Sequence, residues 1–295
     1  MTTPPLLFDR ALHRRRLDRA APSYADFLKR RAADDVVFRL GAIMRRFPLA
    51  VDLGARTGAF AQALAASEAR DKVDLLIETD LSATMLDRPG ARLVADEERL
   101  PFASESLDLI VSTLSLHWTN DLIGALVQAR LALKPDGLFI GAFLGGATLT
   151  ELRQSLLSAE AELSGGASLR VSPFADASDA GGLLQRSGFA LPVADVDRVT
   201  VRYSHPVELL RDLRAMGETN VLLERSRTPL TRRVLGRALE LYVEQFSEAD
   251  GKVRASFEII TVTGWSPHES QQKPLKPGSA KMRLADALGT TEHKL

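Results

Sequence analysis

The sequence predicts an α/β protein with a Rossmann-like, seven-stranded sheet, helices on both of its faces and helical insertions in the C-terminal half. Two observations support this fold class. Short apolar segments alternate with helical segments as far as Leu144, which is the pattern of a parallel sheet wound with helices. The first apolar segment also runs through a glycine-containing turn into a helix, between Val51 and Ala66. Such a strand, turn and helix form the corner at which sheets of this class bind nucleotides.

Composition places the chain among ordinary globular proteins. Its 295 residues are 45% apolar and 26% charged, and its formal net charge at pH 7 is zero, so nothing global attracts it to nucleic acid. The absence of cysteine excludes disulfides, thiolate nucleophiles and Cys-ligated metal centres. No uncharged apolar run is long enough for a transmembrane helix. The five histidines show neither HExxH nor HxD spacing, so no metal site is predicted.

The N-terminal segment, residues 8–47, is rich in arginine. It lacks the apolar core of a secretory signal, and its interspersed aspartates argue against a mitochondrial presequence. We therefore expect two helices that pack on the domain through apolar side chains. These side chains are Tyr24, Phe27, Leu28, Val36, Val37 and Leu40.

The turn after the first strand indicates the kind of ligand. Asp52 lies at the end of the strand, and Gly54 and Gly58 allow the loop backbone to lie close to a bound molecule. A carboxylate at this place would repel a pyrophosphate, so Asp52 predicts a positively charged ligand. S-adenosylmethionine, with its sulfonium and ammonium groups, meets that requirement.

At these residues the sequence resembles the class I S-adenosylmethionine-dependent methyltransferases, whose first motif has an acid followed by three alternate glycines. Asp52, Gly54 and Gly58 match this motif, but Arg56 replaces the middle glycine. A non-glycine residue in a glycine conformation costs on the order of 1–3 kcal/mol. The resemblance implies that this loop, including Ala55, contacts the cofactor, and Arg56 predicts that cofactor binding is weakened, altered or lost. An ordinary structural turn remains an equal alternative for the motif alone.

Further candidates for cofactor binding follow the next three predicted strands, because ligands lie at the carboxyl ends of such strands. Asp80 closes the second strand, where an acid binds the ribose diol; a helix cap is its alternative role. Asp96 follows the third strand and is a candidate acceptor for the adenine amino group. The complete set from these strand ends is Asp80, Leu81, Asp96, Glu97 and Ser112.

His117 and Trp118 follow the fourth strand, at the edge where a transferred group would lie. His117 is a candidate general base and Trp118 a candidate wall of the substrate pocket, although packing is an equal alternative for both. The Asn/Asp-Pro-Pro-Tyr/Phe signature of many N-methyltransferases does not follow this strand. Methylation of nucleobases is therefore not expected.

The pattern changes after Gly145. Helical segments now separate two last strands, which we expect to be antiparallel and to carry a helical cap. The expected helices cover 121–133, 148–163, 179–187, 206–216 and 230–246, and the expected strands cover 138–144, 193–203 and 256–264. The resulting division is a cofactor-binding core over 48–145, a cap with the last two strands over 146–265 and a C-terminal tail of loop over 266–295.

Several segments outside the glycine turn carry a more specific resemblance. They are Phe8–Arg10, Ala95–Glu98 with Leu100–Phe102, Ser112–Asp121, Leu133–Gly137, Ser172–Phe174, Gly217–Asn220, and Gly264–Trp265 with His268–Gln271. Together they resemble the mitochondrial complex I assembly factors of methyltransferase fold, which hydroxylate an arginine of a complex I subunit, and their bacterial relatives. The malonyl-carrier-protein methyltransferases of biotin synthesis are similar at a greater distance. Arg56 is again the departure, since these relatives have glycine there.

The resemblance implies an S-adenosylmethionine-binding enzyme that acts on a protein side chain, with a respiratory complex I subunit as partner. It implies that residues 1–47 form a lid, with Tyr24 over the cofactor, and that the protein works in the bacterial cytoplasm or the mitochondrial matrix. Hydroxylation needs an oxidant, and the sequence shows neither a 2-His-1-carboxylate spacing nor a flavin motif. Methyl transfer needs mainly alignment of a nucleophile.

Two other functions remain open at this point. One is an O-methyltransferase of a small molecule or an acyl-carrier thioester, for which the cap should form an apolar tunnel. The other is a non-catalytic binding protein in which Arg56 closes the cofactor site. An Arg56 side chain that fills the cavity, with Asp52 and Asp80 turned away from it, would favour the non-catalytic protein.

Overall fold

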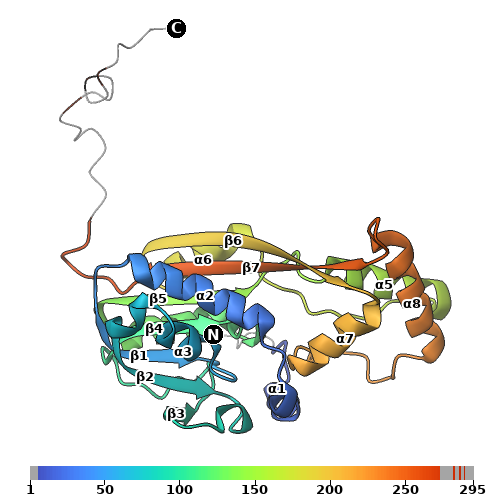
Figure 1. Ribbon diagram of the computed structural model, residues 1–295, viewed down its shortest axis with the longest axis horizontal. Coiled ribbons are helices and arrows are strands. Elements are labelled where there is room, and N and C mark those ends of the chain that lie inside the picture. Colours follow the sequence, from blue (N-terminus) through green and yellow to red (C-terminus); the bar gives the residue numbers. More distant parts are fainter. Residues whose placement is uncertain (1–5, 273–281, 283–285, 287–288, 290–295) are drawn as a thin grey trace.

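The computed structural model describes residues 6–272 together with residues 282, 286 and 289. Its centre is a seven-stranded sheet with the strand order β3-β2-β1-β4-β5-β7-β6 (Figure 1). β7 is antiparallel to β5 and β6, and all the other neighbouring strands are parallel. The strands are β1 (Phe47–Leu53), β2 (Val73–Asp80), β3 (Ala91–Val94), β4 (Leu107–Thr113), β5 (Leu133–Leu144), β6 (Ala190–Tyr203) and β7 (Val253–Trp265). The predicted Rossmann-like fold class is confirmed.

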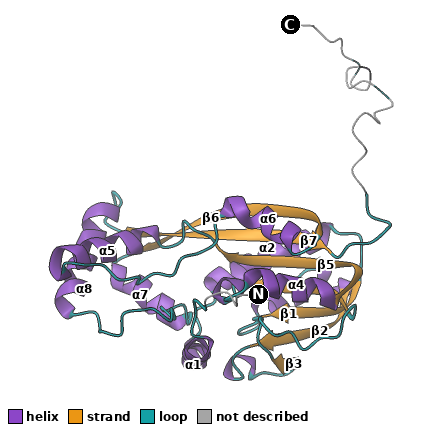
Figure 2. Ribbon diagram, turned by 180° about the vertical axis from the view of Figure 1, so that it is seen from behind, coloured by secondary structure: helices purple, strands orange, loops and turns teal. Residues whose placement is uncertain are grey.

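Helices cover both faces of the sheet (Figure 2). α2 (Phe27–Ala42) and α3 (Ala59–Ala65) pack on one face, and α4 (Leu122–Ala132) and α6 (Ala180–Arg186) pack on the other. Neighbouring residues of β4 point to opposite sides: Ile110 packs with α4 and α6, whereas Val111 packs with α2 and α3. Since both faces are buried, the central strands are almost continuously apolar.

The cap consists of α5 (Thr150–Ser164), α7 (Pro206–Ala215) and α8 (Arg232–Phe246). These helices lie around the far ends of the long strands β6 and β7, beyond the compact part of the sheet (Figure 1). Leu152, Leu209, Leu241 and Phe257, one from each helix and one from β7, are buried in a single apolar cluster. The cap therefore shares its core with the strands that carry it.

The predicted pair of N-terminal helices is present as α1 (Arg10–Ala20) and α2. The prediction was wrong for Phe27, whose side chain is 38% exposed. The buried stripe of α2 runs through Leu28, Ala32, Val36 and Leu40, at the spacing of one helical face, and Phe27 lies beside that stripe.

Two local expectations differ in detail from the structure. The sequence from Leu81 to Leu86 predicts the start of a helix with Ser82 as its N-cap, but only a short 3₁₀ turn, Thr84–Leu86, forms there. Ser82 does accept a hydrogen bond from the Met85 backbone, as a cap would. The tail assigned to loop lies largely outside the described residues. None of the helices within the described chain is both long and apolar enough to cross a membrane.

Candidate functional site

The glycine turn after β1 has left-handed backbone at all three motif positions. The φ angles are +70° at Gly54, +51° at Arg56 and +83° at Gly58. A Cβ atom on Gly54 would lie only 2.1 Å from the Ser115 hydroxyl oxygen, so a side chain does not fit there. Arg56 adopts the conformation that glycine tolerates and bears a strain on the order of 1–3 kcal/mol.

The Arg56 side chain is fully buried and bonded to Asp80. Its guanidinium Nη1 lies 2.7 Å from Asp80 Oδ2, and its backbone N–H donates to the same oxygen at 2.9 Å. The other oxygen of Asp80 accepts from the Ser82 backbone at 2.8 Å. Burial alone would lower the pKa of Arg56, but the effect of the Asp80 carboxylate is in the opposite direction and the pKa is raised overall, so the guanidinium stays charged. The carboxylate predicted to bind a ribose is thus occupied by a cation of the chain itself.

A second cation of the chain, Arg10, is bonded to the acidic residues that follow β3. Arg10 of α1 donates to Asp96 at 2.6 Å and also to Glu97, which in turn accepts from the Ser115 hydroxyl. Burial would raise the pKa of Glu97, but Arg10 and Arg56 outweigh it and lower the pKa to about 2. Glu97 therefore remains ionised, and the predicted adenine acceptors are tied to the N-terminal helix.

Asp52 presents the opposite situation, a buried carboxylate without partners. Neither of its oxygens has a hydrogen-bond partner among the described residues. Lys29 of α2 is buried nearby, and its ammonium donates to the Gly54 carbonyl at 2.7 Å and to the Thr113 hydroxyl at 2.9 Å. Burial raises the pKa of Asp52 to about 7, although Lys29 opposes this change. An unpartnered buried carboxylate is a feature that calls for a functional explanation, and it fits a cationic ligand.

Three other predicted cofactor-binding residues lie at the same strand ends. The Ala55 backbone N–H donates to the Thr79 carbonyl at 2.8 Å, and the Ser112 hydroxyl donates to the Leu53 carbonyl at 3.0 Å. Leu81 follows Asp80 directly and is half-buried. Ala55 and Ser112 therefore also hold the ends of β1, β2 and β4 together.

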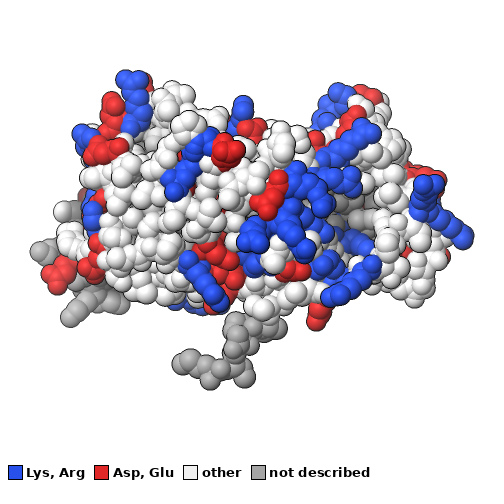
Figure 3. Space-filling model, turned by 90° about the horizontal axis from the view of Figure 1, so that it is seen from below, with Lys and Arg blue, Asp and Glu red and all other residues white. Residues whose placement is uncertain are grey.

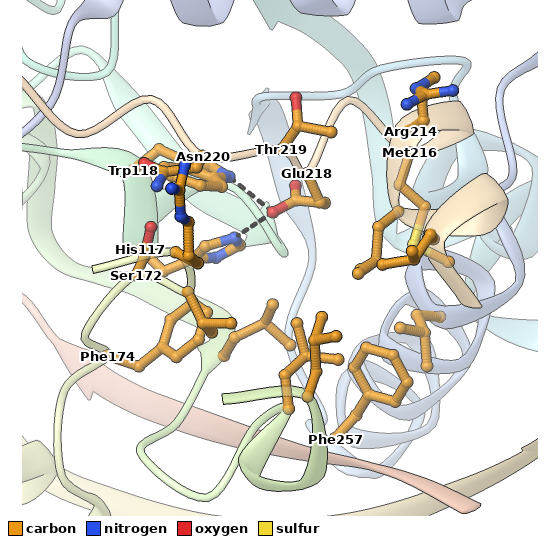
Figure 4. A pocket seen from close by; sticks show the side chains of 18 of the residues that line it. His117, Trp118, Ser172, Phe174, Arg214, Met216, Glu218, Thr219, Asn220 and Phe257 are labelled. Atoms are coloured by element: carbon orange, nitrogen blue, oxygen red, sulfur yellow. Dashed lines mark hydrogen bonds and ion pairs between the residues drawn. The ribbon is translucent and has the colours of Figure 1, made fainter. Parts of the chain in front are cut away.

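His117 and Trp118 line a chamber between α2, the segment after β4 and the cap (Figure 4). Lys29, which donates to the Gly54 carbonyl, also lines it, so the chamber adjoins the glycine turn. The chamber has a volume of about 340 Å³ and mostly apolar walls, which include Leu149, Leu213 and Phe257. Glu218, which follows α7, is the one carboxylate among the described residues that line it. A single oxygen of Glu218 accepts from Trp118 Nε1 at 2.7 Å and lies 3.1 Å from His117 Nε2.

Sequence reasoning missed the roles of Lys29, Arg10 and Glu218. Lys29 lies on the buried face of α2 with Ala32, Ala33 and Val36, and a cation within an apolar stripe was a usable signal. Arg10 and Glu218 belong to segments that carried the resemblance, but their partners lie far away in the sequence. Only the folded chain shows what they bind.

The predicted condition for a closed cofactor site is met only in part. Arg56 does occupy the site, as that condition requires. Asp80, however, points towards Arg56, and Asp52 has no hydrogen-bond partner in the described part of the chain. The residues present fit a cationic adenosyl cofactor at Asp52, whereas Asp80 is already bonded to Arg56.

Asp52→Asn should stabilise the protein at alkaline pH. Because the pKa of Asp52 is about 7 in the folded protein, above the 3.8 of a carboxyl in the unfolded chain, its contribution to stability falls as pH rises between these values. An amide escapes that loss, so we expect a gain on the order of 1–3 kcal/mol in the free energy of unfolding at pH 8 and a smaller gain at pH 5. Urea unfolding at both pH values measures it.

Asp74→Asn is the matched control, because Asp74 is exposed and pairs with Arg46 on the surface. It should give no pH-dependent gain. Equal effects of the two substitutions would contradict the burial of an unpartnered carboxylate at Asp52.

Comparison with known proteins places this geometry in a family. Residues 51–141 match the methyltransferase domain model. The chain is 41% identical over 290 residues to "Arginine-hydroxylase NDUFAF5, mitochondrial" of Danio rerio, which covers 95% of this chain and 89% of that one. It is 34% identical over 284 residues to the malonyl-[acyl-carrier protein] O-methyltransferase of Methylovorus sp. (strain MP688), covering 90% of this chain and 92% of the relative.

The solved structure of the YcgJ protein from Bacillus subtilis has a similar fold. Its TM-score is 0.55 at 15% sequence identity, and the match covers 80% of this chain and 98% of that one. This likeness agrees with the Rossmann-like fold of the sheet. The chain belongs to the S-adenosylmethionine-dependent methyltransferase superfamily, in the family that contains the NDUFAF5 arginine hydroxylases and, at greater distance, the malonyl-carrier-protein methyltransferases.

Proposed function

We propose that this protein binds S-adenosylmethionine and modifies a basic side chain, arginine in the first instance, of a protein partner such as a respiratory complex I subunit. The substrate class is inferred from Glu218, the one carboxylate among the described residues that line the mainly apolar chamber; of the cations that also line it, Lys29 is bonded to Gly54 and Thr113 and Arg170 to Glu160. The relative named as an arginine hydroxylase supports the same class of substrate. The bacterial cytoplasm or the mitochondrial matrix is the corresponding location.

The residues that would hold the cofactor are those at the strand ends. Asp52 would face its positive charge, Asp80 its ribose, and Asp96 with Glu97 its adenine. When bound, S-adenosylmethionine supplies a methyl group on a cationic sulfur. The contribution of the protein is to exclude water and to hold the target side chain in line, which by itself removes much of the barrier to transfer.

The chamber suits a long side chain with a cationic end. Apolar walls match the aliphatic stem of arginine, and the carboxylate of Glu218 can accept from a guanidinium. Trp118 and His117 hold one oxygen of Glu218 and leave its other oxygen without a hydrogen bond to the described chain (Figure 4). His117 Nδ1 is also buried without a partner in that part of the chain, and we assign His117 the role of a proton acceptor and Trp118 that of a wall.

Intact-mass spectrometry of candidate partner proteins tests the proposal. Each partner is incubated with this protein, with S-adenosylmethionine and, in a parallel reaction, with a source of oxygen and reductant. A gain of one methyl group identifies a methyltransferase, and a gain of one oxygen atom identifies a hydroxylase. Binding of S-adenosylhomocysteine without any change in a basic partner would contradict the proposed substrate.

Glu218→Gln should lower kcat/KM for such a partner by about a hundredfold, because the neutral amide keeps the hydrogen bond to Trp118 but loses the charge that attracts the guanidinium. Binding of S-adenosylhomocysteine should be unchanged, since Glu218 lies in the chamber and not at the strand ends. Steady-state kinetics with calorimetry separates the two effects. Glu162→Gln, an equivalent change in an ion pair with Arg237 on the cap, is the control and should leave both unchanged.

The apolar chamber also supports a second function, transfer to an acyl-carrier thioester. A volume of about 340 Å³ with mainly leucine walls accommodates a short acyl chain, and the more distant relatives are named for such a substrate. Methylation of a malonyl thioester by the wild-type protein, with no modification of basic partners, would favour this function. Glu218→Gln would then improve the reaction, because the Glu218 carboxylate repels an acidic substrate.

A further inference from the structure

Arginine residues gather beside the mouth of the chamber. We call Arg16 and Arg19 of α1, Arg214 of α7 and Arg225 of the following loop the arginine face. Figure 3, seen from the side on which α1 lies, shows a dense group of basic side chains on this surface. Three of the four, with Thr219, line a polar hollow of about 270 Å³. In a chain with no net charge, this is a local concentration of positive charge.

The charges of the arginine face are poorly compensated within the described chain. Arg19 and Arg214 form no ion pair there, and Arg225 has only a long contact of 3.8 Å with Asp9. Arg16 is bonded to the Thr219 hydroxyl at 2.7 Å and the Asn220 carbonyl at 2.6 Å, which are neutral groups. Partial burial and then the charges of Arg225 and Arg19 lower the pKa of Arg16. The four guanidiniums repel one another, so an anion would be attracted to this surface.

The arginine face and the chamber are parts of one structure. Arg214 and Thr219 line both the polar hollow and the chamber, and Thr219 follows Glu218 directly in the chain. By holding residues 219 and 220, Arg16 fixes the loop that carries the Glu218 carboxylate. A molecule bound at the mouth therefore meets the arginine face outside and, inside, Glu218, the one acid among the described lining residues. The cations Lys29 and Arg170, which also line the chamber, are bonded to other groups of the chain.

We infer that the arginine face docks an acidic segment of the partner protein, in which carboxylates flank the basic residue that enters the chamber. This inference rests on the proposed function and adds the sequence character of the substrate. Guanidinium groups bind carboxylates in a bidentate manner, which favours arginine over lysine for such a surface. The arginine face and Glu218 together favour a segment that carries both acidic and basic residues. A uniformly basic segment would be repelled by the arginine face, and a uniformly acidic segment would offer no cation to Glu218.

Fluorescence anisotropy with short synthetic peptides tests the inference on the full-length protein. One labelled peptide has a central arginine flanked by glutamates, and its matched peptide has glutamines in place of the glutamates. At low salt we expect the acidic peptide to bind about tenfold more tightly, and the difference to shrink as salt increases. The double substitution Arg19→Glu with Arg214→Glu should abolish the difference. Arg186→Glu, an exposed position on α6, should preserve it.

The possible results are distinct. Equal binding of the two peptides, or an equal loss in the Arg186→Glu variant, would overturn the inference. Displacement of the acidic peptide by inorganic phosphate at low concentration, or equally tight binding of a short RNA or of phosphatidylglycerol vesicles, would show a different anion and would also overturn it. Circular dichroism of each variant checks folding. Fluorescence anisotropy measures binding of the peptide, and mass spectrometry measures the reaction. Failure of docking can therefore be distinguished from failure of the proposed function.

Discussion

Asp80→Ala is expected to lower the free energy of unfolding by about 3–5 kcal/mol, the usual cost of removing one partner of a buried ion pair. The substitution leaves the fully buried Arg56 guanidinium without the carboxylate to which it is bonded. It also removes the acceptor of two backbone N–H groups, those of Arg56 and Ser82, which burial keeps from water. Urea unfolding followed by tryptophan fluorescence measures the loss.

A double-mutant cycle shows whether the buried charge is the cause. Asp80→Ala combined with Arg56→Gly removes both charges, so we expect the double variant to be more stable than Asp80→Ala alone. Asp80→Asn should lie between wild type and Asp80→Ala, since its side-chain oxygen can still accept a backbone hydrogen bond. A loss below about 1 kcal/mol in Asp80→Ala would mean that the pair is not buried in solution.

The sheet could be predicted from the sequence because its signals are local. Buried strands such as β4 are short apolar runs, and Asp121 caps the next helix by accepting from the Gly124 backbone. Gly165, with a φ of +68°, follows the last residue of α5 and ends it. Each of these features depends on neighbouring residues only, and for that reason local patterns were sufficient.

The carboxylates at the strand ends were also predictable, because parallel strands bring their carboxyl ends to one edge. The cations to which these carboxylates are bonded could not be predicted. Arg10 meets Asp96 across 86 positions of sequence, and Lys29 reaches Thr113 across 84. Contacts of this kind arise from the packing of α1 and α2 onto the sheet edge, and no local pattern encodes them. The glycine motif could only indicate that Arg56 was unusual.

The chamber is the part of the site that the sequence described least well. An apolar tunnel in the cap was considered for one alternative function, and the apolar walls agree with it. The placement of Glu218 beside His117 and Trp118, however, depends on a loop 100 residues further along the chain. Because that loop is held by Arg16 of α1, the N-terminal segment helps to form the chamber.

Arg56→Gly is expected to increase the affinity for S-adenosylhomocysteine by roughly ten- to a hundredfold, the equivalent of about 1.4–2.7 kcal/mol. The substitution removes the guanidinium that competes for Asp80. Glycine also tolerates the φ of +51° at this position, so the loop can keep its conformation. Isothermal titration calorimetry measures the change directly.

Arg88→Met is the matched control for this increase. Arg88 is a cation next to the same loop, but it donates to the Arg56 carbonyl at 2.6 Å and pairs with Glu78, so it does not compete for Asp80. We expect no gain in affinity for this variant. Weaker binding by Arg56→Gly would contradict competition and would show that the guanidinium itself contacts the ligand.

Affinity and stability together separate competition from a purely structural role for Arg56. If Arg56 only supports the fold, its removal should lower both the stability of the free protein and its affinity for the ligand. If it competes for Asp80, its removal should lower the stability of the free protein, since Asp80 is left buried without a cation, yet raise the affinity. Ligand present in excess should then restore the stability of the variant more than that of the wild type, because stabilisation by a ligand grows with its affinity. Opposite signs in the two measurements would therefore identify Arg56 as an internal competitor at a functional cofactor site.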